Sequence, residues 1–160
     1  MRVRHIYISD AHNFFGHHGK PPGETPMLEV AEAACVTGKG IVGDRFFDYK
    51  PDYKGQVTFF SWEVYEDIKR QFGLAEEVEP RVFRRNIIVE GVDLNELIGK
   101  HFTVQGVEFL GTSDAAPCYW MNGAVAEGAE EALENRGGLR AKILSDGTLR
   151  ADPALVPVQV

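Results

Sequence analysis

The sequence contains only two cysteines, Cys35 and Cys118, and this scarcity excludes several classes of protein. Two cysteines can build neither a disulfide-rich scaffold nor the four-cysteine zinc site of a small structural module. A phosphate-binding loop that ends in Gly-Lys-Ser or Gly-Lys-Thr is also missing, which argues against nucleotide hydrolysis. The low cysteine content is typical of a protein in a reducing compartment, and the expected location is the cytoplasm.

Long hydrophobic runs and an excess of positive charge are missing as well. The sequence contains no stretch of 18 consecutive apolar residues, so no transmembrane helix is predicted. The first ten residues also lack the apolar run of a signal peptide. A net charge of −7, from 17 basic and 24 acidic residues, argues against general binding to nucleic acid or to an anionic membrane. The 160 residues suit a single domain that spans positions 1–160.

The chain does contain many short apolar segments, separated by turn residues that include 17 glycines and 8 prolines. Alternating or apolar patterns predict strands over residues 3–8, 28–36, 57–60 and 86–89, and hairpins around Gln105-Gly106 and Asp146-Gly147. Helical spacing predicts helices over residues 62–72 and 128–136 and a helical turn over residues 93–98. Many short strands with two to three short helices predict a mainly β fold, either a barrel or a curled sheet.

One glycine pattern resembles a nucleotide-binding motif but lacks its context. Gly38, Gly40 and Gly43 match the dinucleotide fingerprint G-x-G-x-x-G, which requires a helix directly after it to receive a pyrophosphate. Residues 44–51 show no apolar stripe at helical spacing and end in a proline. The glycines are therefore interpreted as a turn that presents Asp44 and Arg45.

Cys118 is the sharpest candidate for chemistry in the sequence. It follows Pro117 on a loop after a predicted strand, and aromatic residues come next. A thiolate in such a place is a strong nucleophile and a soft metal ligand. The alternative is an inert buried thiol, and that reading is assigned to Cys35, which lies within an alternating apolar segment.

A basic cluster forms the second candidate. Arg81, Arg84 and Arg85 precede Asn86 at the entry to a predicted strand. Neighbouring strand residues point to opposite faces, so Arg84 and Arg85 are not expected to serve one purpose. One guanidinium suits a phosphate or another anion, and the alternative is a solvated surface cluster.

Three histidines form the third candidate, within an aperiodic stretch over residues 10–26. His12, His17 and His18, together with Cys118 or Asp44, are a candidate zinc or iron site, although no metal-binding spacing is present. The alternative is a polar loop that folds over a ligand pocket, where histidine donates hydrogen bonds or transfers protons.

A nucleophilic triad built from the same residues is a further alternative. Cys118, one of the three histidines, and Asp44 or Asp114 supply the groups of a cysteine hydrolase, provided that the fold brings them together. A zinc hydrolase that uses the histidines is a further alternative.

Five segments follow one another in a characteristic order. They are Gly40-Ile41-Val42-Gly43-Asp44-Arg45, Arg84-Arg85-Asn86-Ile87-Ile88-Val89-Glu90-Gly91-Val92-Asp93, Leu97-Ile98-Gly99, Ala116-Pro117-Cys118, and Gly138-Leu139-Arg140-Ala141-Lys142-Ile143-Leu144 followed by Gly147. Together they resemble the MOSC family, named for the C-terminal domain of molybdenum-cofactor sulfurases, and the likeness runs from about residue 37 to residue 150. The histidine segment resembles a feature of small, stand-alone members.

The resemblance implies a barrel-like β fold around a pocket with one cysteine, which carries sulfur as a persulfide or ligates molybdenum. By position, that cysteine is Cys118, with His12 and Asp44 as proton-relay candidates. The residues expected to contact the pterin cofactor or to flank its site are Arg45, Arg84, Arg85, Asn86, Tyr119 and Asn122.

The resemblance also limits what is expected. The chain is expected to lack the additional N-terminal β domain of the long reductases and the aminotransferase-like domain of the sulfurases, so a pyridoxal phosphate lysine is not assigned. The implied partners are a small-molecule or cofactor ligand and a cysteine desulfurase or metalloenzyme. The implied activity is that of a molybdenum-dependent oxidoreductase module or a sulfur carrier. A non-catalytic module that binds a small anion or a partner protein is the alternative.

Overall fold

A computed structural model describes residues 1–11 and 26–152 of the chain. Strands predominate, as the sequence predicts. The strands are β1 (Arg2–Ile8), β2 (Leu28–Glu29), β3 (Glu32–Val36), β4 (Gly40–Ile41), β5 (Val57–Ser61), β6 (Ile87–Glu90), β7 (His101–Val104), β8 (Val107–Asp114), β9 (Leu139–Ile143) and β10 (Gly147–Arg150). The helices are α1 (Trp62–Gln71), α2 (Trp120–Ala124) and α3 (Ala129–Ala132), with short 3₁₀ helices η1 (Pro80–Phe83) and η2 (Leu94–Leu97).

The strands form two sheets that curl around one core. The larger sheet has seven strands in the order β2-β1-β6-β5-β9-β8-β7, and only the β5–β6 pair is parallel. The smaller sheet has the order β10-β3-β4. The fold is mainly β and loosely barrel-like, but over the described ranges no ladder joins the edge strands β2 and β7 into a closed cylinder.

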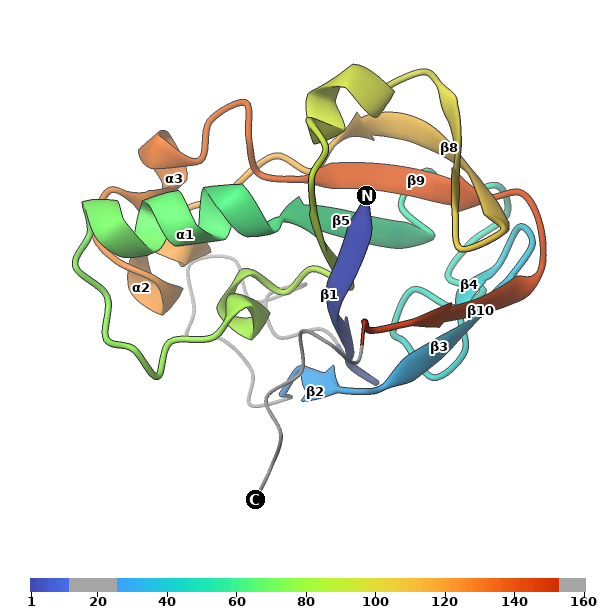
Figure 1. The fold of residues 1–160 in the computed structure, drawn as a ribbon, viewed down its shortest axis with the longest axis horizontal. Coiled ribbons are helices and arrows are strands. Elements are labelled where there is room, and N and C mark those ends of the chain that lie inside the picture. Colours follow the sequence, from blue (N-terminus) through green and yellow to red (C-terminus); the bar gives the residue numbers. More distant parts are fainter. Residues whose placement is uncertain (12–25, 153–160) are drawn as a thin grey trace.

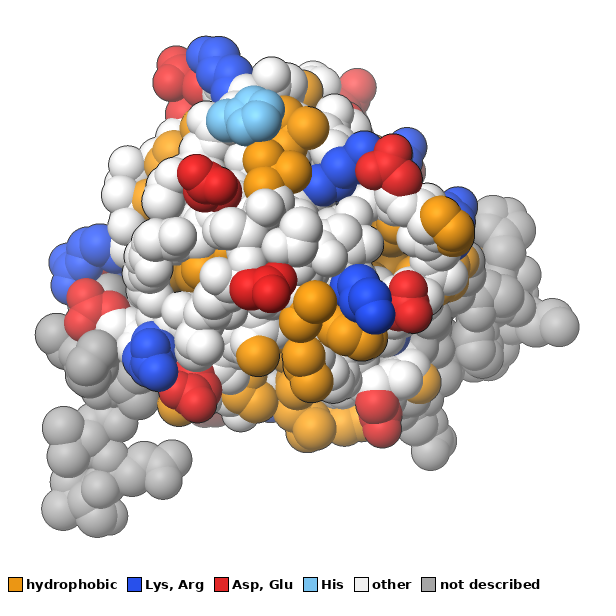
Figure 2. All heavy atoms as spheres, turned by 90° about the vertical axis from the view of Figure 1, so that its right-hand side faces the viewer, with side chains coloured by type: hydrophobic (Ala, Val, Ile, Leu, Met, Phe, Trp, Pro, Cys, Tyr) orange, Lys and Arg blue, Asp and Glu red, His pale blue; other side chains and the backbone are white. Residues whose placement is uncertain are grey.

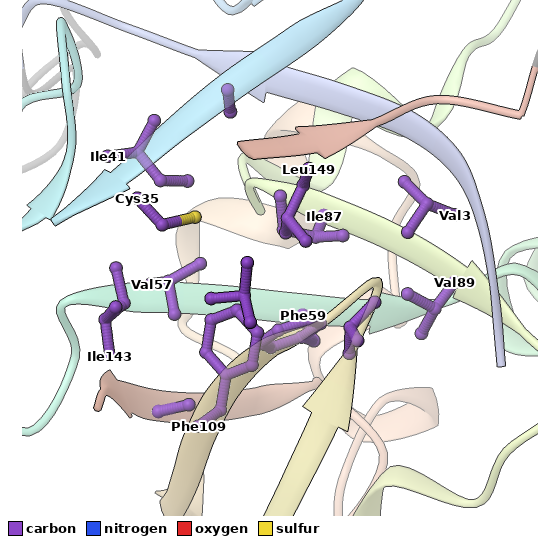
Figure 3. Packing of buried hydrophobic residues seen from close by; sticks show 14 of the residues in the cluster. Val3, Cys35, Ile41, Val57, Phe59, Ile87, Val89, Phe109, Ile143 and Leu149 are labelled. Atoms are coloured by element: carbon purple, nitrogen blue, oxygen red, sulfur yellow. The ribbon is translucent and has the colours of Figure 1, made fainter. Parts of the chain in front are cut away.

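Apolar side chains from both sheets fill the space between them (Figure 3). Phe59 of β5 packs edge-to-face against Phe109 of β8, with ring centroids 5.3 Å apart. Cys35 of β3 points into this core and is 2% exposed. Burial raises the pKa of Cys35 to about 11, so this thiol is an inert packing residue, as predicted.

The opposite face of the larger sheet packs against the helices, which gather at one end of the sheet (Figure 1). Alternation along the strands sends Phe60 and Ile88 to this face, where they meet Ile68 of α1 and Met121 of α2. Ser61 caps α1 by accepting a hydrogen bond from the amide of Val64, as predicted. The helices cover only part of this face, and the remainder is polar.

Two predictions of secondary structure are wrong, and one helix was missed. Residues 141–149 do not form a hairpin, because β9 belongs to the larger sheet whereas β10 pairs with β3. Asp146 accepts hydrogen bonds from Thr37 instead and fixes the corner between the sheets. The helix expected over residues 128–136 is confined to α3, and the helix α2 was not predicted.

The segment expected to be extended over residues 28–36 forms two strands that pair with different partners, β1 and β10. The hairpin around Gln105-Gly106 is confirmed as the β7–β8 pair. No helix among the described residues is long and apolar enough to cross a membrane. Figure 2 shows the end of the molecule around the smaller sheet, where acidic and basic side chains alternate with hydrophobic ones.

Candidate functional site

Cys118 lies on a short loop between β8 and α2. Cys118 is exposed, whereas Cys35 is buried. The loop ends where the carbonyl of Cys118 accepts a hydrogen bond from the amide of Met121, at the first turn of α2. The exposure predicted for Cys118 is therefore confirmed, and the residue is available to a ligand or a partner.

Arg85 holds this loop in place. Its buried guanidinium donates from Nε to the carbonyl of Gly137 (3.0 Å) and from Nη2 to the carbonyl of Ala115 (3.0 Å). A third hydrogen bond reaches the carbonyl of Phe83. Burial and the charge of Arg140 lower the pKa of Arg85 to about 10, whereas the negative charge of a Cys118 thiolate acts in the opposite direction. Arg85 thus positions the loop and supplies a positive charge near the sulfur.

Two glycines let the loop approach β9 closely. A Cβ at Gly137 would lie 2.3 Å from the carbonyl oxygen of Ala115, and one at Gly138 would lie 2.4 Å from the carbonyl oxygen of Phe59. Gly138 also has φ +120°, which disfavours other residues. The amide of Ala115 donates to the carbonyl of Gly138 at 2.8 Å. The path of the loop that carries Cys118 therefore depends on this pair of glycines.

Asp44 and Arg45 form a buried ion pair at the turn that follows β4. Nη1 of Arg45 lies 3.0 Å from Oδ1 of Asp44, and the carboxylate also accepts hydrogen bonds from the amides of Ser9 and Phe46. Nη2 of Arg45 donates to the carbonyl of Arg84 at 3.0 Å. Burial lowers the pKa of Arg45, and Asp44 opposes that shift. The two residues join the turn to the basic cluster, a link that the sequence did not predict.

Arg84 and Arg85 do point in different directions, but not because they alternate along a strand. Arg84 ends η1 in the left-handed conformation, with φ 55°, and β6 begins only at Ile87. Nη2 of Arg84 lies 3.4 Å from the hydroxyl of Ser9 and 3.3 Å from the carbonyl of Ala11. Burial and the charge of Arg45 lower the pKa of Arg84 to about 10, and Asp44 acts in the opposite direction. A non-glycine residue held in this conformation is strained, a feature common at functional sites.

Asn86 joins three strands from a fully buried position. Its Oδ1 accepts hydrogen bonds from both the amide and the hydroxyl of Thr58, and its Nδ2 donates to the carbonyl of Tyr7. These bonds occupy the side chain within the scaffold. The prediction that Asn86 contacts a cofactor remains a prediction.

Thr58 and Asn86 belong to a row of polar side chains that crosses the larger sheet on its helix-bearing face. Thr58 pairs with Arg140 of β9, and Arg140 pairs with Ser113 of β8. Asn86, Thr58, Arg140 and Ser113, here called the polar row, therefore lie on four adjacent chain segments. Arg140 and Ser113 were not proposed as site residues from the sequence. Arg140 and Lys142 are the two charged residues inside the alternating segment Leu139–Ile143, and this alternation is the signal that could have pointed to Arg140.

Tyr119 and Asn122 lie on the other side of Cys118. Tyr119 is exposed at the start of α2. Oδ1 of Asn122 accepts a hydrogen bond from the amide of Glu130 (3.0 Å) and lines a groove with several acidic residues. These residues are Asp114, Glu127, Glu130, Glu131 and Glu134. Asn122 therefore faces an acidic groove, whereas Arg85 faces the basic side of the loop.

The histidine segment lies outside the described residues, so His12, His17 and His18 are not placed. Within residues 1–11 and 26–152, no group of three or more His, Cys, Asp or Glu side chains has the arrangement of a metal site. The zinc, iron and triad alternatives that involve these histidines remain predictions.

The described residues fit a molybdenum–pterin cofactor in the chemistry of their donors. An exposed thiol is the soft ligand that such a metal requires, and the positive charge of Arg85 close to it favours the phosphate of the pterin tail. Within residues 1–11 and 26–152, Asp44 is the single carboxylate whose charge shifts the pKa values of Arg45, Arg84 and Arg85. The basic side of the Cys118 loop therefore has a surplus of positive charge.

Solved structures with this fold cover nearly the whole chain. The YuaD protein from Bacillus subtilis is 17% identical, with a TM-score of 0.72 over 94% of this chain and 91% of that one. YiiM from Escherichia coli is 20% identical, with a TM-score of 0.62 over 95% of this chain and 67% of that one. YiiM from Geobacillus stearothermophilus is 12% identical, with a TM-score of 0.68 over 94% of this chain and 71% of that one. No curated protein matches the sequence.

The family model of the MOSC domain matches residues 16–155. This range contains both sheets except for β1, together with the Cys118 loop and the residues Asp44, Arg45, Arg84 and Arg85. The resemblance seen in the sequence is therefore confirmed, and the chain belongs to the MOSC domain family.

Proposed function

We propose that this protein binds a molybdenum–pterin cofactor through Cys118 and acts as an oxidoreductase module. The observation that carries the proposal is the exposed Cys118 on a loop that the buried Arg85 stabilises through hydrogen bonds to the carbonyls of Ala115 and Gly137. In the MOSC family a pocket cysteine is associated with molybdenum or with sulfur, and the Ala116-Pro117-Cys118 segment of this sequence resembles the one that carries it.

The chain's own residues have separate tasks in this proposal. Cys118 ligates the metal, and Arg85 keeps the loop in position through its hydrogen bonds to the carbonyls of Gly137 and Ala115. Arg84 and Arg45 provide positive charge for the phosphate, and Asp44 orients Arg45. When bound, the molybdenum centre supplies the redox chemistry of the reaction.

Metal and pterin analysis of the purified full chain tests this proposal. Protein made in a cofactor-sufficient host is expected to contain molybdenum and pterin in near-equal amounts. Cys118→Ser is expected to lose most of the molybdenum, whereas Cys35→Ala, the matched control at the other cysteine, is expected to retain it. Wild-type protein without molybdenum and pterin would contradict the proposal.

The exposure of Cys118 also favours a second candidate, a sulfur carrier. In this reaction the Cys118 thiolate attacks the outer sulfur of a donor persulfide, such as that of a cysteine desulfurase. A new S–S bond forms at Cys118, the donor S–S bond breaks, and the donor leaves as a thiolate. The hydrogen bonds from Arg85 to the loop keep the sulfur in one place.

Mass spectrometry separates the carrier from the oxidoreductase module. After incubation with a cysteine desulfurase and cysteine, wild-type protein is expected to gain a reducible adduct of about 32 Da on Cys118. Cys118→Ser is expected to gain none, and Cys35→Ala is expected to behave like the wild type. Absence of the adduct on the wild-type protein would exclude the carrier reaction with that donor.

A further inference from the structure

The polar row contains two groups whose hydrogen bonds are not satisfied within the described structure. Thr58 and Asn86 bond to each other through three contacts of 3.0–3.1 Å. By contrast, the guanidinium of Arg140 donates to no acceptor and pairs with no carboxylate within residues 1–11 and 26–152. Oγ of Ser113, directly opposite Arg140, is buried and also lacks a partner there. A buried hydroxyl without a partner is rare and calls for an explanation. The guanidinium of Arg140 is only half-buried, so it is open to water or to a ligand.

The strand register determines where Arg140 points. Its neighbours Leu139 and Ala141 lie in the core between the sheets, so Arg140 extends from the opposite face. This part of that face is not covered by the helices, which pack against Phe60 and Ile88. Arg140 therefore extends from the same face as the basic groups near Cys118.

The surroundings of Arg140 attract negative charge. The Arg140 guanidinium lies within electrostatic range of Arg85 and of the hydroxyl of Tyr53. Lys142, which shares its face of β9, is already paired with Asp52 at 2.8 Å. A guanidinium that is left unpaired beside other arginines is stabilised by an anion, and its planar edge matches an oxyanion through two parallel hydrogen bonds.

We propose that Arg140 and Ser113 form a subsite for an oxyanion of phosphate or sulfate type, beside the Cys118 loop. Arg140 supplies the charge and two donors, and the hydroxyl of Ser113 adds a third. The inference deepens the proposed function, because such a subsite holds either an anionic group of the substrate or the phosphate of the cofactor. The binding of the oxyanion itself does not depend on the Cys118 thiol.

Titration of the full chain with inorganic phosphate and with sulfate, at constant ionic strength set by chloride, tests the subsite. Calorimetry is expected to show saturable binding of phosphate to the wild-type protein. Arg140→Gln is expected to weaken it about tenfold, and Arg140→Lys, which keeps the charge but loses the planar edge, less than that. Ser113→Ala is expected to weaken it about threefold.

Matched controls make the result specific. Arg70→Gln removes the same charge from an exposed residue of α1 and is expected to leave phosphate affinity unchanged. Cys118→Ser is expected to bind phosphate like the wild type even when its molybdenum is lost, so the two proposals fail independently. The subsite is refuted if Arg140→Gln binds phosphate with wild-type affinity, or if Arg70→Gln loses as much affinity as Arg140→Gln.

The pterin content of Arg140→Gln, made in the cofactor-sufficient host, identifies the source of the oxyanion. Unchanged pterin together with weakened phosphate binding assigns the subsite to the substrate. Pterin that falls in parallel with phosphate binding assigns it to the cofactor. Circular dichroism and thermal unfolding of each variant verify that the protein is folded before either result is interpreted.

Discussion

The two halves of the polar row differ in how their hydrogen bonds are satisfied. Asn86 and Thr58 bond to each other and to β1, and the neighbouring Arg85 donates to three carbonyls. Arg140 and Ser113, on the adjacent strands, have no such partners among the described residues. Side chains in the first half hold the scaffold together, whereas those in the second half are available for a ligand. Residue type alone does not separate the two roles. The first half has the hydroxyl of Thr58 and the neighbouring Arg85, and the second half has the hydroxyl of Ser113 with Arg140.

The largest effect on stability is expected for Arg85→Gln. This change leaves the carbonyls of Ala115, Gly137 and Phe83 without the donor that now satisfies them. The expected loss is about 3–5 kcal/mol in the free energy of unfolding, because each abandoned buried acceptor costs on the order of 1–3 kcal/mol. Urea denaturation measures it, with Arg70→Gln as the exposed control.

A loss below about 1 kcal/mol for Arg85→Gln would show that the loop does not depend on this arginine. The distinction between a structural Arg85 and a ligand-binding Arg140 would then fail. Gln rather than Ala is chosen because it keeps part of the side-chain volume and one donor.

The next largest effect is expected for Asn86→Ala. The amide and hydroxyl of Thr58 and the carbonyl of Tyr7 all lose a partner at a position with no access to water. The expected destabilisation is about 2–3 kcal/mol by urea denaturation. Asn95→Ala, at an exposed position with a single side-chain donor bond, is expected to cost less than about 1 kcal/mol. Equal losses at the two positions would contradict a scaffold role for Asn86.

These residues also show what the sequence can and cannot predict. Local patterns correctly predicted the helix that Ser61 caps, the β7–β8 hairpin and the exposed Cys118 loop, because the causes lie within a few residues. Two of the carbonyls that Arg85 binds, those of Ala115 and Gly137, lie 30 and 52 positions away along the chain. No local pattern therefore marks Arg85 as a positioning residue.

The same limit explains the wrong hairpin near Asp146. The residues Asp146-Gly147 do favour a reversal, but the strand that follows pairs with β3, which lies more than a hundred positions earlier in the chain. Competition between the two sheets for β10 is a long-range effect, because Leu149 is buried in the core between them. Turn chemistry therefore located the reversal, and packing selected the partner.

The two thiols extend the comparison to pH dependence. Burial raises the pKa of Cys35 from its usual value near 9 to about 11, so the folded protein holds this proton more tightly than the unfolded chain does. The contribution of Cys35 is therefore complete below pH 9 and falls by up to about 1.4 kcal/mol per pH unit as the pH rises toward 11.

Urea denaturation of wild type and Cys35→Ala at several pH values between 8 and 10.5 isolates this effect, which reaches about 2 kcal/mol at the top of the range. The difference in stability between the two proteins is expected to shrink as the pH rises, because only the wild type has the thiol to lose. A difference that stays constant would contradict a raised pKa for Cys35. Cys118→Ser is the matched control, since its exposed side chain lies outside the core.

The smallest effect, and the one of opposite sign, is expected for Ser113→Ala. Its buried hydroxyl has no partner among the described residues, so its removal relieves a desolvation cost instead of breaking a bond. The expected result is a gain of about 0.5 kcal/mol in the free energy of unfolding without phosphate, together with the weaker phosphate binding described above. Saturating phosphate is expected to reverse the order of the two proteins, because the ligand stabilises the wild type more. A loss above about 1 kcal/mol without phosphate would show that the hydroxyl serves the scaffold, and the two halves of the polar row would no longer differ.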